Sequence, residues 1–251
     1  MMSRRLLMYL LAIGIGAPLA MAHPVQAQRS GEGFLFREPV ASLQLRGGYH
    51  HANAGSDLFS FATKQLTLRQ RDFGGPMLGG DLALRIHPRM DLAFGATYSS
   101  ASAVSEFRDW VDRDDLPIEQ TTRFERVPLT ASAKAYLTPR GRSIGSFAWL
   151  PARYAPYVGA GGGAMWYRFH QEGDFVDFET LEIFSDELTS SGWAPIAQAL
   201  AGLDISLTPR FGLTGEARYS WARAELGDSF EQFDPIDLSG LSATFGIHLR
   251  F

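Results

Sequence analysis

The 251-residue sequence contains no cysteine, and after its first 22 residues it has no long apolar run. The lack of cysteine excludes a lipoprotein anchor and is compatible with an oxidising compartment, where many exported proteins use no disulfides. The lack of a second apolar run leaves no further candidate for a transmembrane helix. If the rest of the chain enters a membrane, it must do so as a closed sheet, because in lipid every backbone N–H and C=O needs an internal partner.

An excess of positive charge is also missing. Asp and Glu number 27 against 23 Lys and Arg, and the formal net charge is −4. A nucleic-acid partner would require a basic patch, so none is expected.

The N-terminus has the pattern of a secretory signal peptide. Arg4 and Arg5 precede an uncharged, mostly apolar run from Leu6 to Ala22. Cleavage could follow Ala20-Met21-Ala22 or Val25-Gln26-Ala27, and the second site is favoured because it comes after the end of the apolar run.

Three regions follow from this pattern. We expect residues 1–27 to be a cleaved signal peptide, residues 28–38 a periplasmic N-terminal segment and residues 39–251 one folded domain. The alternative is an N-terminal membrane anchor, although an apolar run of this length, interrupted by glycine and proline, is at the short limit for spanning a bilayer.

The C-terminus carries the sharpest structural signal. Apolar residues alternate there with polar or small ones up to the last position, which is aromatic. A period of two predicts a β-strand with one face in an apolar medium. The apolar positions are Leu241, Ala243, Phe245, Ile247, Leu249 and Phe251, and the intervening ones are Ser242, Thr244, Gly246, His248 and Arg250.

Seven upstream segments have a comparable strand pattern, which gives eight strands in all. The fifth is a strand by composition, but its four glycines between positions 159 and 163 leave open which side chains share a face. The upstream segments are 41–50, 78–86, 92–99, 129–137, 157–169, 197–207 and 213–221.

The C-terminal strand resembles the last strand of outer-membrane β-barrel proteins. Over residues 39–251 the pattern resembles the small outer-membrane β-barrel superfamily of the OmpA, OmpX and OmpW type, without an appended peptidoglycan-binding domain. The resemblance implies an eight-stranded antiparallel up-and-down transmembrane β-barrel with long external loops in a Gram-negative cell envelope. It also implies that the barrel-assembly machinery recognises Phe245, Ile247, Leu249 and Phe251.

The connections between the predicted strands fall into two classes. Three even-numbered strands end in the same apolar-polar-Pro-Arg pattern, at 86–89, 137–140 and 207–210, where proline stops the strand and starts a turn. The odd-to-even connections are longer, at about 51–76, 100–126, 170–193 and 224–238. Short periplasmic turns and long external loops place both termini on the periplasmic side.

Two features of these connections go beyond the simple pattern. The second turn, Gly141 to Ala155, is long and carries Phe147, Trp149 and Tyr154, which predicts contact with the membrane interface. In the first loop, Ser56 and Asp57 precede an apolar run and could cap a short helix over the barrel rim.

The predicted lumen carries charges of both signs. Eight strands leave room for side chains to fill the interior but not for a water channel. Buried polar groups need partners, so we expect a structural ion-pair network there, with a narrow pore as the alternative. The inward-facing charged residues are Arg46, Asp81, Arg85, Lys134, Asp204, Glu216, Arg218 and Arg250.

No catalytic, cofactor or metal site is expected. The glycine run 159–164 has the form of a dinucleotide fingerprint, but a strand-like segment follows it instead of a helix. Some barrels of this size modify lipid A, and the nearest approximation to their His, Ser and acid is His50 with Ser56 and Asp57. Nothing in the sequence fixes the geometry of these three residues.

The expected function is a structural or surface-interaction role without catalysis. Its partners would be outer-membrane lipid and lipopolysaccharide, with signal peptidase and the barrel-assembly machinery acting during biogenesis; a surface ligand is not identified. The acidic and aromatic loops would be solvated or would bind divalent cations, lipopolysaccharide or another macromolecule. The alternatives are a narrow passive transporter of small or hydrophobic solutes and, less favoured, a lipid A-modifying enzyme. A fold resemblance cannot choose between them.

Overall fold

A computed structural model describes residues 33–251 except 113, 146, 178–179 and 181. The predicted signal peptide and the first part of the predicted N-terminal segment therefore lie outside the described residues. Within the described part of the chain, no helix is long and apolar enough to cross a membrane.

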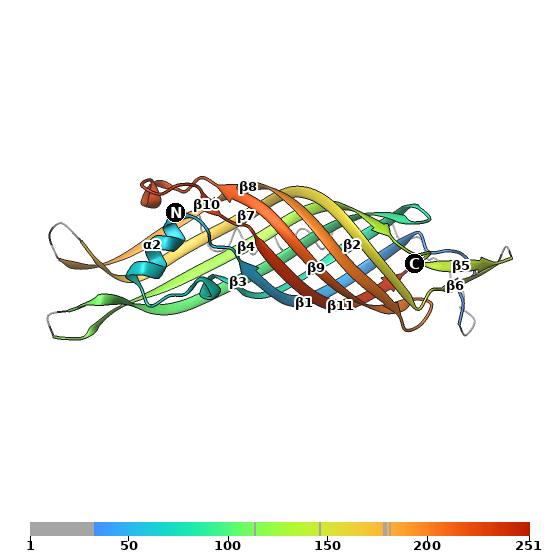
Figure 1. Cartoon of the computed structure of the whole chain (residues 1–251), viewed down its shortest axis with the longest axis horizontal. Helices are drawn as coiled ribbons and strands as arrows, with labels where there is room; N and C mark the ends of the chain where they lie inside the picture. The colour runs from blue at the N-terminus through green and yellow to red at the C-terminus, as the bar shows by residue number, and fades with distance from the viewer. Residues whose placement is uncertain (1–32, 113, 146, 178–179, 181) are drawn as a thin grey trace, which may run out of the picture. The chain divides into compact units, whose positions relative to one another are not determined.

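Eight antiparallel strands close into one barrel (Figure 1). Each strand pairs with its neighbours in sequence, and β11 returns to pair with β1 from Ser42↔Arg250 to Ala52↔Gly240. This closure removes the sheet edges and confirms the predicted up-and-down barrel. The strands are β1 (Ala41–Ala52), β2 (Gly75–His87), β3 (Met90–Val111), β4 (Pro117–Tyr136), β7 (Tyr154–Val176), β8 (Ile183–Ser206), β9 (Phe211–Ala224) and β11 (Gly240–Arg250).

Short elements occupy the connections. Figure 1 shows α2 at one end of the barrel and the β5–β6 hairpin at the other. The short elements are α2 (Asp57–Gln65), the 3-10 helices η2 (Gln70–Phe73) and η3 (Asp228–Phe230), the hairpin strands β5 (Gly141–Ile144) and β6 (Ala148–Pro151), and β10 (Ile236–Asp237), which pairs with β9.

The predicted alternation of inward and outward side chains is confirmed. On β9, Thr214, Glu216, Arg218 and Ser220 are buried, whereas the residues between them are exposed or half-buried. The same alternation on the other strands turns large apolar side chains away from the lumen.

The fifth strand in the barrel, β7, now has a defined register. Tyr157, Met165, Tyr167 and Phe169 are buried in the lumen, so the odd-numbered positions from 155 to 171 face inward. Gly161 faces inward with them, and a Cβ there would lie 2.1 Å from the carbonyl oxygen of Ala131. The glycines hid the register from sequence analysis because they carry no side chains that could show which face is apolar; in the structure they let the neighbouring strands approach closely.

The prediction of a loop was wrong for two of the connections, because the strands continue through these segments. The segments expected as loops at 100–126 and 170–193 are largely the outer halves of β3, β4, β7 and β8, which pair up to Val111↔Pro117 and Val176↔Ile183. Their acidic residues suggested loops, but a strand needs only one buried face. Glu119 is exposed while its neighbours Ile118 and Gln120 are buried.

The lumen near α2 is filled by a hydrophobic core. Leu58, Phe59 and Ala62 of α2 are buried, and the Phe59 ring lies 4.6 Å from Phe73 and 5.6 Å from Phe124. The predicted helix is therefore confirmed, but its apolar face packs into the barrel interior. Ser56 precedes the helix without a side-chain capping hydrogen bond.

The long second turn forms the β5–β6 hairpin. Leu35, before β1, exchanges two backbone hydrogen bonds with Trp149 at 2.9 and 2.7 Å. Trp149 is buried, whereas Phe147 and Tyr154 are exposed. Phe147 and Tyr154, two of the three aromatic residues predicted to contact the membrane interface, are therefore exposed and can make that contact.

Candidate functional site

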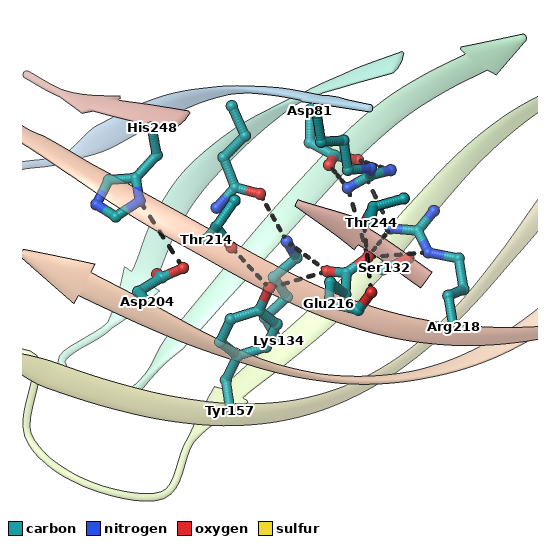
Figure 2. Close-up of polar contacts among 12 residues, drawn as sticks. Asp81, Ser132, Lys134, Tyr157, Asp204, Thr214, Glu216, Arg218, Thr244 and His248 are labelled. Atoms are coloured by element: carbon teal, nitrogen blue, oxygen red, sulfur yellow. Dashed lines mark hydrogen bonds and ion pairs between the residues drawn. The ribbon is translucent and has the colours of Figure 1, made fainter. Parts of the chain in front are cut away.

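The charged side chains of the barrel interior form the most distinctive cluster of the molecule (Figure 2). Five of the eight predicted lumen residues meet in it. We call this set the lumen network: Arg46 on β1, Asp81 on β2, Lys134 on β4, and Glu216 and Arg218 on β9.

Glu216 is at the centre of the lumen network. Its carboxylate lies 3.4 Å from Arg46 Nη1, 3.2 Å from Lys134 Nζ and 2.7 Å from Arg218 Nη2. It also accepts a hydrogen bond of 3.0 Å from the Tyr157 hydroxyl. Four donors thus satisfy one carboxylate that is almost wholly removed from solvent, as a buried charge requires.

Asp81 is the second anion of the lumen network. Arg46 forms an ion pair with it through both terminal nitrogens, one of them at 3.2 Å, and Arg218 Nη2 lies 3.9 Å away. A Cβ at position 95 would lie 2.0 Å from Asp81 Oδ1, so Gly95 on β3 provides the room for this carboxylate.

Neutral side chains complete the lumen network. Lys134 donates to Gln44 Oε1 at 3.1 Å, and Arg218 donates to Gln198 Oε1 at 3.2 Å. Gln198 in turn donates to Ser132 Oγ at 2.6 Å. The cluster therefore links β1, β2, β4, β7, β8 and β9 across the barrel.

Sequence analysis missed Tyr157 and the two glutamines as members of this cluster. Only charged residues were singled out for the predicted lumen, so uncharged polar residues such as Gln198 were left out. Tyr157 could be placed only once the register of β7 was known. The inward positions of Gln44 and Gln198 follow from alternation, so a search that included neutral donors and acceptors would have found them.

The other three predicted lumen residues lie apart from the lumen network. Asp204 accepts from the Tyr136 hydroxyl at 3.0 Å, and Arg250 donates to Ser206 Oγ at 2.9 Å. Arg85 is only half-buried and forms an ion pair with Glu38, which precedes β1. The expectation of one network of eight is therefore corrected to a central cluster and separate pairs.

These separate pairs surround a cavity of about 20 Å³ at the end of the barrel that carries the β5–β6 hairpin. A further pair missed by sequence analysis lines it: Arg140, after β4, lies 2.8 Å from Asp91 on β3. Both signs of charge are present around this cavity, yet several buried polar atoms of its lining, among them Asp91 Oδ1, Arg140 Nη2 and Asp204 Oδ1, have no hydrogen-bond partner among the described residues.

The weak enzyme candidate does not assemble. Within the described residues, His50 Nδ1 lies 2.9 Å from Ser242 Oγ, while Asp57 accepts backbone N–H groups of Leu58 and Asp234 at 2.8 and 3.0 Å. The glycine run 159–164 lies inside β7, far from any helix N-terminus that could hold a pyrophosphate. In the described part of the chain no group of three or more His, Cys, Asp or Glu could hold a metal ion.

The four residues expected to carry the assembly signal lie on the outer face of β11. Phe245, Ile247 and Phe251 are exposed and Leu249 is half-buried. The last residue continues the pairing with β1, because its backbone N–H donates to Ala41 at 3.0 Å.

No family model matches the sequence, and no curated protein matches it. Solved structures do match. They include small outer-membrane β-barrel proteins, with TM-scores below 0.5. Neisserial surface protein A is 14% identical, with 84% of this chain and 97% of that chain covered and a TM-score of 0.47. OprG from Pseudomonas aeruginosa is 12% identical, with 86% of this chain and 99% of that chain covered and a TM-score of 0.45. Ail, the attachment invasion locus protein of Yersinia pestis, is 13% identical, with 88% of this chain and 100% of that chain covered and a TM-score of 0.37. These likenesses concern the fold of the barrel alone.

Proposed function

We propose that the protein is an outer-membrane β-barrel with a structural or surface-interaction role and no catalytic activity. The observation that carries the proposal is the outer face of the barrel, where large apolar side chains are exposed on every strand. Examples are Leu78 at 69%, Phe245 at 61% and Trp193 at 60% exposure. Soluble monomers rarely expose so continuous an apolar surface, whereas lipid would cover it.

The height of this apolar face suits a bilayer. On β9, Phe211 and Trp221 are both exposed and are separated by about ten residues, the length that a tilted strand needs to cross the hydrocarbon core. Aromatic residues at the two ends of the apolar band are typical of outer-membrane barrels. Tyr49 and Trp193 lie toward the α2 end, and Tyr154 and Phe251 toward the opposite end.

A structural role is favoured over transport because the lumen is filled at two levels. The lumen network crosses the barrel between six strands, and the hydrophobic core around Phe59 fills the end near α2. The side chains that occupy both levels of the lumen disfavour the narrow passive transporter.

The proposed orientation places the three Pro-Arg turns and both ends of the barrel domain in the periplasm. The β3–β4 and β7–β8 hairpins would then project outside the cell, with Glu119, Glu172 and Glu187 exposed on them. These hairpins are the surface proposed to meet lipopolysaccharide, divalent cations or a macromolecular ligand. Export would use the signal peptide expected at residues 1–27, followed by barrel assembly through the C-terminal strand.

One fractionation experiment tests this proposal. The full-length gene is expressed in a Gram-negative host, and outer-membrane fractions are run on gels with and without heating. We expect the protein in the outer membrane, with a mobility that changes on heating. An unshifted periplasmic protein would refute the proposal.

Conductance separates the structural role from the transporter. The purified barrel is reconstituted in planar bilayers, and we expect no unitary currents. Reproducible currents that change when Glu216 is replaced by Gln would favour the transporter.

A further inference from the structure

A second small cavity lies between the lumen network and the hydrophobic core. Its volume is about 30 Å³. Arg218 of the lumen network borders it on one side, and Met165 and Ile196 of the hydrophobic core border it on the other. The other lining residues are the apolar Met77 and Pro128 and the polar His50, Thr97, Ser99, Arg126, Gln198, Ser220 and Ser242. The cavity is therefore polar on several sides and large enough for a small solute.

Arg126 on β4 is the residue that makes this cavity unusual. Its side chain is among the largest that are fully buried, yet among the described residues neither Nε nor Nη1 has a hydrogen-bond partner. Arg126 Nη2 donates a hydrogen bond of 3.5 Å to the Phe73 carbonyl, and the guanidinium carbon lies 4.6 Å from the centroid of the Phe124 ring. A buried cation without a counter-charge carries a large desolvation penalty.

The surroundings do not supply that counter-charge. Among the described residues no Asp or Glu borders the cavity, and Arg126 forms no ion pair with any of them. The neighbouring lumen network cannot compensate, because it holds three cations against two anions. The middle of the barrel therefore carries an excess of positive charge.

The lining also offers hydrogen-bond donors. His50 Nε2 has no hydrogen-bond partner in the described part of the chain, and Nδ1 of the same ring lies 2.9 Å from Ser242 Oγ. When the Ser242 hydroxyl donates to Nδ1, the ring carries its hydrogen on Nε2 as a further donor. Hydroxyl groups of Thr97 and Ser99 border the same space, whereas the Ser220 hydroxyl donates to the Gly240 carbonyl at 3.4 Å. A site rich in donors and free of carboxylates favours an anion.

We infer that this cavity binds one small monovalent inorganic anion, such as chloride, beside the guanidinium of Arg126. Its volume is about that of two water-sized spheres, at roughly 10–15 Å³ each. Chloride fits such a space. This inference goes beyond the proposed function and does not depend on the role of the protein at the cell surface.

Urea unfolding of the folded barrel in detergent tests the inference. The midpoint is measured in sodium chloride and in sodium gluconate at equal ionic strength, because gluconate is too large for the cavity. We expect a higher midpoint in chloride for the wild type, since a ligand that binds only the folded state stabilises it. Bromide should act as chloride does.

A matched pair of variants assigns the effect to the cavity. Arg126→Met should lose the dependence on chloride, whereas Arg123→Met should keep it. Arg123 lies on the same strand but is exposed, so both changes remove one positive charge and only one alters the cavity. A wild type without a chloride-dependent shift, or equal shifts in both variants, would overturn the inference.

If Arg126→Met does not fold, X-ray diffraction from crystals of the wild-type barrel tests the inference. Crystals of the wild-type barrel are grown with bromide, and an anomalous peak within contact distance of the Arg126 guanidinium is expected. Density for water alone, with no anomalous signal at that place, would show that the cavity only hydrates Arg126.

Discussion

The two halves of the barrel interior are filled in opposite ways. Near the middle, Glu216 and Asp81 are held by three cations and by neutral amides and hydroxyls. Near α2, Phe59 packs among the rings of Phe73, Phe124 and Phe169, and the Arg126 guanidinium lies 4.6 Å above the Phe124 ring. The polar half depends on matched partners and tolerates little change, whereas the apolar half depends on volume.

The outer face explains why this division is possible. A soluble protein needs its apolar side chains in one central core. In this barrel the large apolar side chains of the strands lie instead on the outer face, where they are exposed. The interior can therefore hold polar side chains where only strands surround it. It becomes apolar where the α2 segment folds into the barrel and needs a surface to pack against.

Replacing Glu216 with Gln should have the largest effect on stability. The change leaves Arg46, Lys134 and Arg218 without their shared anion, and breaking a buried ion pair typically costs about 3–5 kcal/mol. The free energy of unfolding is measured by urea titration in detergent. The control is Glu119→Gln, an exposed position on β4, and equal losses for the two variants would contradict the central role of Glu216.

Replacing Phe59 with Ala should destabilise the barrel by about 3 kcal/mol. The loss comes from a cavity among packed rings and leaves no charge unpaired. Phe61→Ala on the same helix is the matched control, because Phe61 is 40% exposed. If both substitutions had the same small effect, α2 would not anchor the apolar half.

Replacing Lys134 with Met should cost less than replacing Glu216, about 1–2 kcal/mol. Glu216 keeps Arg46 and Arg218, and the remaining four charges of the lumen network are balanced. A double-mutant cycle with Glu216→Gln measures the coupling between the two residues. Additive losses would show that Lys134 and Glu216 contribute independently.

Replacing Phe251 with Ala should leave both halves of the interior intact and change stability by less than about 0.5 kcal/mol. Its side chain is exposed on the outer face at the end of β11. In cells, however, we expect less folded barrel in the outer membrane, with export across the inner membrane unchanged. Normal assembly would argue against an assembly signal at the C-terminus, and Phe211→Ala, exposed on the adjacent strand β9, serves as the control.

Much of the barrel could be predicted from sequence because its signals are local. Leu213 to Trp221 alternate with Thr214 to Ser220 whatever the neighbouring strands do, so the faces of β9 were correct. The proline turns separated strands that follow each other directly. The outer halves of β3, β4, β7 and β8 were missed for the same reason: their exposed faces are charged, and a local pattern cannot show that the opposite face is covered by α2.

The sequence by itself determined the number of strands, their order and the inward position of the five charged residues of the lumen network, because a period of two is set by the geometry of a single strand. The tertiary structure decided which of these residues meet. Arg46, Lys134 and Glu216 come from three strands distant in sequence, and their contact depends on the register of every intervening pair and on closure between β1 and β11. The same closure sets Arg126 beside a cavity without carboxylates, which no single strand reveals.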